Sequence, residues 1–322
     1  MPGDGVREAV VIGAGLTGLA AAFTLERAGL TPTLIEVKKR AGGSIDTVRE
    51  NDFVMDAGSM LHTIGDRPAF DAFLAEIGLD DALAETGDGR ILFRDGTAAL
   101  IDALDQRITG SRMIRMAVST LGELDGRFSI CMENGMLLDA RALVVAVPAR
   151  YAERLFYTLT PDISARLLDY RYDSIARVSL GYRLADVRSI ATAPPPDYPV
   201  TFIDHTAASG RVPDGHVLIQ AGIRYDPAAR GYQDLAGEFT ARMGWPQNPV
   251  VGHTGVWPEA DPVMWRDPDH AVSMAALQAL LPDGVALAGS DYIPAAHPPR
   301  LDERIAAGQA AAKRVLAHLG RV

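Results

Sequence analysis

The sequence has a single cysteine, Cys131, among its 322 residues. One thiol excludes a disulfide framework and a metal site built from several cysteines, and it fits a reducing cytosol. Basic residues are fewer than acidic ones, 31 against 41, and the resulting formal net charge of −10 argues against a nucleic-acid or anionic-lipid surface. The 7 histidines show no paired metal-ligand spacing. We therefore expect a cytoplasmic protein without a metal site and without a nucleic-acid partner.

Long apolar runs are also missing. The best candidate, residues 9–25, contains three glycines, follows acidic residues and is too short to span a bilayer, so we expect neither a secretion signal nor an integral membrane segment. The hydrophobic fraction of 48% is that of a globular protein, and the length is sufficient for a sizeable core. We expect roughly two domains at this length.

A glycine-rich turn follows a short apolar stretch near the N-terminus. Residues 9–12 are typical of a strand buried on both faces, and residues 13–18 have the spacing G-x-G-x-x-G, followed by apolar residues at helical spacing. A second strand is expected over residues 32–37, and its Glu36 lies about 20 residues after the glycines, where a carboxylate can accept both hydroxyls of an adenosine ribose. This order predicts a dinucleotide site, and an acid in place of an arginine favours NAD or FAD over NADP.

Each position of the glycine turn has a physical role. Gly13 permits the tight bend, Gly15 lets a pyrophosphate approach the backbone, and Gly18 lets the helix pack closely on the strand. The helix start at Leu16 and Thr17 offers free N–H groups and partial positive charge to the phosphates.

A second glycine pair follows the acid, in the run KKRAGGS of residues 38–44. Together with the first glycine turn and the stretch GGSIDTVRENDFVMDAGSML, this run resembles the flavin monoamine oxidase and protoporphyrinogen oxidase superfamily, and most of all its protoporphyrinogen oxidases. The resemblance implies non-covalent FAD, with Arg40 reaching the pyrophosphate; the alternative for Arg40 is a solvated charge in a basic run. It also implies cofactor contacts at Val37, Gly42, Gly43, Ser44, Gly58, Ser59, Met60 and Leu61.

Two later segments extend the resemblance. Residues 113–118, 127–133 and 136–138 alternate like a β-meander, and the resemblance implies that Val118 holds the adenine through its backbone. Another buried strand is expected over residues 142–147. Near the C-terminus a strand over 285–288 and a helix from Leu301 resemble the family's flavin-closing segment, whose helix start stabilises negative charge on the reduced ring. The cofactor contacts implied there are Gly289, Asp291, Pro299, Arg300 and Leu301; a capped terminal helix is the alternative.

Residues 151–265 differ in composition and in hydrophobic pattern from both ends of the chain. Strand-like segments over 175–182 and 216–223 enclose a tract rich in proline and glycine, and a helix is expected over 232–243. The expected fold is α/β: a Rossmann-type FAD-binding domain, with a parallel sheet and a β-meander, from residues 1–150 and 266–322. A smaller, mainly antiparallel substrate domain is expected over 151–265.

Three departures from the family pattern bear on function. Only residues 80–96 replace the family's long helical cap, so the substrate pocket is expected to be open, or closed by a second subunit in a homo-oligomer. Simple amine oxidases place a lysine over the flavin N5, whereas none of the three lysines of this chain lies there; Arg177 falls near that position, with an edge-strand surface arginine as the alternative. Cys131 lies in the meander and not in the C-terminal flavin segment, so a covalent thioether to the flavin is not expected.

These observations predict an FAD-dependent oxidoreductase, an oxidase or a dehydrogenase, that removes hydride from a C–N or C–C bond of a small neutral or anionic apolar substrate. Dioxygen or another acceptor would reoxidise the flavin, and no acid–base residue is assigned. The WPEADP stretch at 257–262 resembles a W-x-x-A-x-P stretch of protoporphyrinogen oxidases. The alternatives are a carotenoid-desaturase or renalase-like flavoenzyme, and a non-catalytic binding protein that keeps the nucleotide fold.

Overall fold

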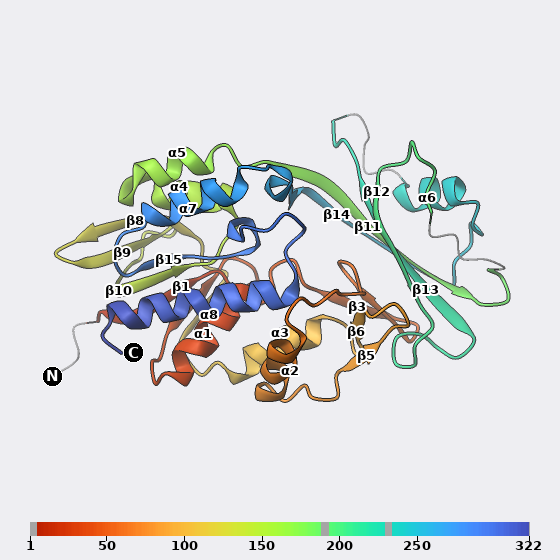
Figure 1. Cartoon of the computed structure of the whole chain (residues 1–322), viewed down its shortest axis with the longest axis horizontal. Helices are drawn as coiled ribbons and strands as arrows, with labels where there is room; N and C mark the ends of the chain where they lie inside the picture. The colour runs from red at the N-terminus through yellow and green to blue at the C-terminus, as the bar shows by residue number, and fades with distance from the viewer. Residues whose placement is uncertain (1–4, 188–192, 229–233, 322) are drawn as a thin grey trace.

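The computed structural model describes residues 5–187, 193–228 and 234–321 and has two parts that lie side by side (Figure 1). One part is a largely parallel sheet with helices on both faces, and the other is an antiparallel sheet. The long strands β11 (Tyr172–Arg183) and β14 (Val251–Pro262) lead from one part into the other (Figure 1). The predicted α/β fold class, with a second and mainly antiparallel unit, is confirmed.

The larger sheet has the strand order β7-β2-β1-β10-β9-β8, with β15 paired to β10. Its parallel strands are β1 (Arg7–Ile12), β2 (Thr33–Glu36), β7 (Arg112–Ile114), the second half of β10 (Leu137–Val145), and β15 (Val285–Leu287). Helices cover both faces, and therefore the sheet needs apolar residues at successive positions, as in Ala9–Ile12. The carboxyl ends of β1, β2 and β15 meet at one edge of this sheet.

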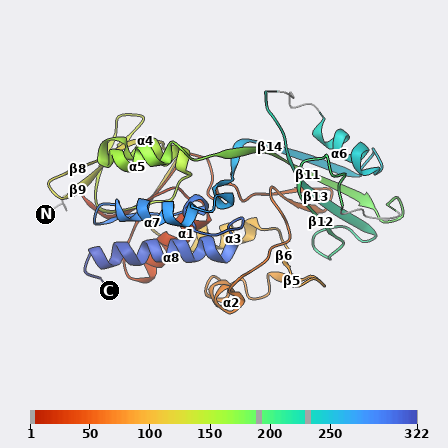
Figure 2. The ribbon, with the colours of Figure 1, turned by 45° about the horizontal axis from the view of Figure 1, so that its top comes forward.

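Two helical layers enclose the parallel sheet, and each contributes its own apolar core. The first core is formed with α1 (Leu16–Arg27), α2 (Arg67–Glu76), α3 (Ala98–Arg107) and α8 (Leu301–His318). The second is formed with α4 (Ala149–Leu159), α5 (Pro161–Leu167) and α7 (His270–Ala279). The turned view places the α4–α5 pair and α8 at opposite sides of this part (Figure 2). Residues 149–167 thus share the core of the parallel sheet, and the expected domain boundary at 150 stays a prediction.

The smaller sheet has the strand order β12-β13-β11-β14 and is antiparallel throughout. It includes β12 (Val200–Thr206) and β13 (His216–Arg224), and α6 (Leu235–Met243) packs on one face through Phe239. The hairpin of β3 (Thr47–Glu50) and β4 (Phe53–Asp56) packs near Gly181 of β11, where an added Cβ would lie 2.5 Å from the Phe53 ring. This contact joins the β3–β4 hairpin to the second sheet.

The β-meander consists of β8 (Val118–Leu124), β9 (Arg127–Met132) and β10, and two details of its prediction were wrong. Residues 112–114 form the parallel strand β7, so the meander begins only at Val118. Residues 136–138 and 142–147 are not separate strands, because β10 runs through both, first antiparallel to β9 and then parallel to β1. Leu137 is exposed and Leu143 is buried. Because exposure changes in this way along β10, its sequence resembles two separate strands.

The strands β12 and β14 were not predicted from the sequence, because they lie in or beside proline- and glycine-rich tracts. The alternative interpretation of Arg177, a surface arginine on an edge strand, is wrong. Arg177 lies on β11, and β11 is an inner strand between β13 and β14. Residues 80–96, in place of a helical cap, hold the short hairpin of β5 (Leu83–Glu85) and β6 (Ile91–Phe93). The expected helix start at Tyr232 lies outside the described residues, as do the side chains of residues 258–261 in the WPEADP stretch.

Within the described ranges, none of the helices combines the length and the apolar character needed to cross a membrane. In the same ranges, no group of three or more His, Cys, Asp or Glu side chains is arranged to hold a metal ion.

Candidate functional site

The glycine turn between β1 and α1 is closed at two positions and open at one. Gly13 has a φ of +102°, and a Cβ there would lie 2.4 Å from the Ala146 carbonyl oxygen; a Cβ on Gly18 would lie 1.9 Å from the Gly13 oxygen. At Gly15 no heavy atom lies within 4 Å of an added Cβ. Gly15 is also the N-cap of α1, and no side chain caps the helix there. The turn therefore presents an open helix N-terminus, which is the arrangement that binds phosphate groups.

The buried carboxylate of Glu36 is fixed beside this turn. The Ala14 N–H donates to Glu36 Oε2 and the Lys38 N–H donates to Glu36 Oε1, both at 2.8 Å. Each carboxylate oxygen has a second lone pair, so the group can still accept hydroxyl donors. The Met116 N–H donates to the Glu36 carbonyl oxygen at 3.0 Å, and this bond brings the start of β8 at Val118 close to the end of β2.

The second glycine pair packs directly on the first glycine turn. The Gly42 N–H donates to the Ala14 carbonyl oxygen at 2.7 Å, and Gly42 and Gly15 form an isolated parallel bridge. The Arg40 guanidinium holds this loop, because it donates to the Ala41 and Ile45 carbonyls and pairs with Asp46 at 2.8 Å. Arg40 is therefore not a free solvated charge; it stabilises the loop that lies against the open turn.

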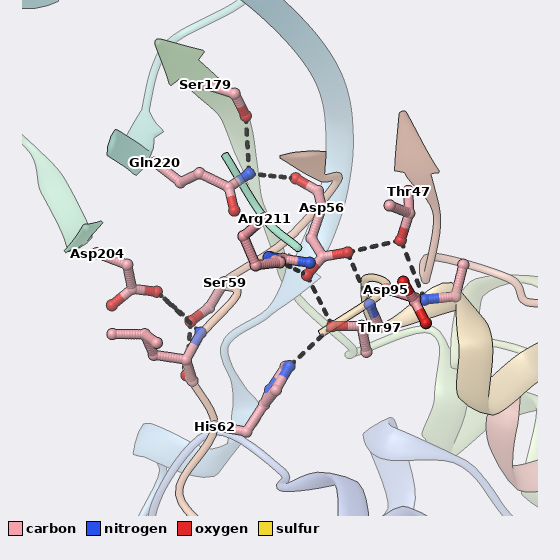
Figure 3. A network of polar contacts seen from close by, with 12 residues as sticks. Thr47, Asp56, Ser59, His62, Asp95, Thr97, Ser179, Asp204, Arg211 and Gln220 are labelled. Carbon is pink, nitrogen blue, oxygen red and sulfur yellow. Dashed lines mark hydrogen bonds and ion pairs between the residues drawn. The ribbon is translucent and has the colours of Figure 1, made fainter. Parts of the chain in front are cut away.

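The loop after β4 is anchored to the second sheet by carboxylates. The Ser59 hydroxyl donates to Asp204 Oδ2 at 2.5 Å, and Arg90 pairs with the other oxygen of Asp204 at 2.8 Å. Figure 3 shows the neighbouring network around Asp56, whose carboxylate accepts from the Thr97 N–H at 2.8 Å and pairs with the fully buried Arg211 at 2.8 Å. These bonds fix residues 56–62 relative to the antiparallel sheet and to the start of α3.

His62 belongs to the same network. Its Nε2 lies 3.0 Å from the Thr97 hydroxyl, and that hydroxyl donates to Asp56 Oδ2, so the imidazole Nε2–H is the donor to Thr97 (Figure 3). Burial lowers the pKa of the His62 imidazole to about 4, although Asp56 and Asp204 oppose the shift. The imidazole is therefore neutral at physiological pH.

The C-terminal segment approaches the site through the start of α8. The Asp302 carboxylate accepts from the Gly65 and Asp66 N–H groups, both at 2.9 Å, and so ties α8 to the loop that follows residues 58–62. Arg300 packs against Gly65, and its N–H donates to Glu303 at 2.8 Å. Gly289 has a φ of +147°, which an L side chain rarely adopts. The buried carboxylate of Asp291 is occupied inside the protein, because it accepts from the Ala149 N–H at 2.8 Å and from the Tyr172 hydroxyl.

The predicted site residues thus come from segments that follow β1, β2, β4 and β15, with Val118 beside them. Bonds connect these segments in pairs: Glu36 to Ala14, Gly42 to Ala14, and Asp302 to Gly65. Pro299, Arg300 and Leu301 begin α8 beside the Gly65 loop. Whether each predicted residue contacts a cofactor stays a prediction.

Sequence reasoning missed His62 and Arg304. The signal for Arg304 was available: the apolar face of α8 contains Leu301, Gly308 and Val315, and a charged side chain at 304 interrupts it. His62 had no such signal, because its hydrogen bond to Thr97, and through Thr97 to Asp56, joins separate parts of the chain.

The residues present fit a bound dinucleotide. Glu36 would accept the two ribose hydroxyls of such a ligand, and the open position at Gly15 would admit its diphosphate at the start of α1. The second glycine loop covers this position from the side through the Gly15–Gly42 bridge.

Comparisons with known proteins agree with this geometry. A family model described as an NAD(P)-binding Rossmann-like domain matches residues 11–77. The coproporphyrinogen III oxidase of Bacillus subtilis is 34% identical over 95 residues, which are 27% of this chain and 20% of that protein. A "Putative protoporphyrinogen oxidase" from Exiguobacterium shares the fold with a TM-score of 0.80 at 15% identity, over 98% of this chain and 99% of that chain. Cyclohexylamine oxidase from Brevibacterium oxydans gives a TM-score of 0.77 at 12% identity, over 98% and 100%.

Fold and site together define the class: a protein with a Rossmann-like dinucleotide domain and a second, antiparallel unit, as in the solved oxidases. The predicted resemblance to the flavin amine oxidase and protoporphyrinogen oxidase superfamily is confirmed. The first curated relatives are matched over only 7% to 24% of their length, and the likeness to the solved structures concerns the fold. The names of these relatives support the prediction of an oxidoreductase.

Proposed function

We propose that this chain is an oxidoreductase that uses non-covalently bound FAD. The observation that carries the proposal is the pair of N–H bonds at 2.8 Å that fix both oxygens of Glu36 beside the open N-terminus of α1. A buried acid held in this way is preorganised for the ribose hydroxyls of an adenine dinucleotide. The second glycine loop, bridged to Gly15, supports FAD over a plain nicotinamide cofactor, because it belongs to the superfamily pattern.

The remaining predicted residues are proposed to surround the same cofactor. Gly13 to Gly18, Val37, and Arg40 with Gly42 to Ser44 would hold the nucleotide half, with Val118 at the adenine. The loop of Gly58, Ser59, Met60 and Leu61 and the start of α8 at Pro299, Arg300 and Leu301 would face the flavin. Because the Asp291 carboxylate already binds the Ala149 N–H and Tyr172, we propose that it positions Gly289 and the start of α8.

When bound, FAD would accept a hydride from a C–N or C–C bond of the substrate. The chain would bind the nucleotide, orient the flavin between the loop after β4 and α8, and offer the positive end of α8 to negative charge on the reduced ring. We propose a small neutral or anionic apolar substrate approaching from the antiparallel sheet, and dioxygen or another acceptor. The short hairpin at 83–93 supports an open pocket or one closed by a second subunit. A cytoplasmic location is proposed from the single cysteine alone.

The proposal is tested by anaerobic titration of the FAD-loaded protein with candidate donors, including a porphyrinogen and a polyene. We expect the flavin absorbance to bleach with at least one donor and to return on admission of oxygen or an artificial acceptor. A protein that binds FAD but is never bleached would be a binding module of the same fold. A protein that binds no FAD would contradict the proposal altogether.

A further inference from the structure

Arg304 is a half-buried cation whose side chain has no hydrogen-bond or ion-pair partner among the described residues. It lies in the first turn of α8, and its guanidinium Nε is buried and has no hydrogen-bond partner among the described residues. Burial lowers the pKa of Arg304 to about 10, and the guanidinium therefore stays charged at neutral pH. Desolvating part of a guanidinium without a partner costs free energy, and an anion bound beside it would offset that cost.

The place of Arg304 follows from the packing of α8 on α1. A Cβ on Gly308 would lie 2.3 Å from the Thr17 carbonyl oxygen and 3.0 Å from Ala21 N, so Gly308 lies against the first turns of α1. Both helices follow carboxyl ends of parallel strands, and they therefore run in the same direction. Arg304 precedes Gly308 by one helical turn, about 6 Å along the axis, which places it at the level where α1 begins.

Charged groups near Arg304 do not neutralise it through a bond. The Asp291 carboxylate is near enough to favour the charged guanidinium, but it is already bonded to Ala149 and Tyr172. The His62 imidazole is neutral, and the charge of Arg304 contributes to the lowering of its pKa. Asp302 Oδ2 accepts from the Gly65 and Asp66 N–H groups, and Asp302 Oδ1 has no hydrogen bond to Arg304 or to any other described residue.

We propose that Arg304, on α8, binds the diphosphate of the dinucleotide. The N–H groups at the start of α1 would bind the other side of the same diphosphate. This inference rests on the proposed function, because it takes the open turn at Gly15 as the diphosphate position. A diphosphate there would supply the anion that Arg304 lacks, and charge-assisted bonds from a guanidinium to phosphate are short and strong. Arg304 would then be a binding residue that neither the glycine turn nor the second glycine loop provides.

The test compares Arg304→Met and Arg304→Lys with Lys313→Met, an exposed cation of the same helix, as the control. Binding of FAD, ADP and adenosine to the apoprotein is measured by calorimetry. We expect Arg304→Met to weaken FAD and ADP by about 10- to 100-fold and adenosine by much less. Arg304→Lys should keep part of the affinity, and Lys313→Met should bind like the parent.

A second readout separates this role from a structural one. Because Arg304 is unpaired without a ligand, Arg304→Met should raise the melting temperature of the apoprotein and reduce the further rise that ADP produces. Unchanged ADP affinity in Arg304→Met would overturn the inference, as would an ADP-independent loss of stability in both Arg304 variants. Unchanged ADP affinity together with a lowered flavin potential would instead place the guanidinium at the flavin ring. If the parent protein binds neither FAD nor ADP, the proposed function itself fails.

Discussion

The Ala14 N–H donates to Glu36 Oε2 across 22 positions of the chain and makes the glycine turn and the end of β2 one unit. Glu36→Ala should therefore weaken FAD binding by about 10- to 100-fold, because charged hydrogen bonds to the ribose are lost. FAD at 100 times its dissociation constant should stabilise the parent protein by about 2.7 kcal/mol. The same FAD concentration should stabilise Glu36→Ala by less. Fluorescence titration and thermal melts with FAD measure both effects, with the exposed Glu133→Ala as the control. Parent-like FAD binding by Glu36→Ala would show that Glu36 is only structural.

The glycine turn allows two single methyl groups to be compared. Gly15→Ala should leave the apoprotein as stable as the parent, because Gly15 has a φ of −73° and open space around an added Cβ, but it should weaken FAD and ADP because the methyl group occupies the phosphate position. Gly13→Ala should destabilise the fold without any ligand, because Gly13 has a φ of +102° and a Cβ there meets the Ala146 oxygen. Urea unfolding of both apoproteins and ADP titration of Gly15→Ala distinguish them. Equal loss of stability in the two variants would contradict the open-turn geometry.

The sequence predicted the β1–α1–β2 segment correctly, because its signals are local. Glycines that permit special backbone geometry, a four-residue apolar run and an acid at the next strand end each act within a few residues of their position. The strand β12 and the continuity of β10 could not be predicted in the same way, because both depend on pairing with strands far away in the chain. The occupied carboxylate of Asp291 depends in the same way on Ala149 and Tyr172, more than a hundred residues away.

His62 should make the protein less stable in mild acid. Its pKa is about 4 when folded and about 6.5 when unfolded, so the unfolded chain takes up the proton first as the pH falls. The contribution of His62 to stability is complete above pH 6.5 and is lost between about 6.5 and 4, on the order of 1 kcal/mol per pH unit. His62→Gln should flatten this part of the stability profile, measured by urea unfolding at several pH values. The exposed His205→Gln is the control, and a profile in which both variants follow the parent would show that His62 titrates normally.

Simple primary amines should be poor substrates. No lysine lies on β11, β12, β13 or β14 in the described ranges, and the residue near the expected lysine position is Arg177, whose guanidinium lies 5.3 Å from the centroid of the Phe202 ring. Cations at Arg177 and Arg300 would repel a protonated amine by Coulomb forces, which are strong at short range in a partly buried site. Anaerobic stopped-flow measurements with benzylamine, a polyamine and a porphyrinogen test this difference. Rapid bleaching of the flavin by either amine at micromolar concentration would show that the pocket accepts cations.

The central claim is that this chain holds FAD by non-covalent contacts at the turn of Gly15 and Glu36. The most direct measurement is the absorption spectrum of the purified protein, followed by heat or acid denaturation and chromatography of the released cofactor. We predict a yellow protein, or one that turns yellow on reconstitution, and intact FAD in the supernatant after denaturation. A colourless protein that FAD does not reconstitute, or flavin that stays with the denatured chain, would contradict the claim.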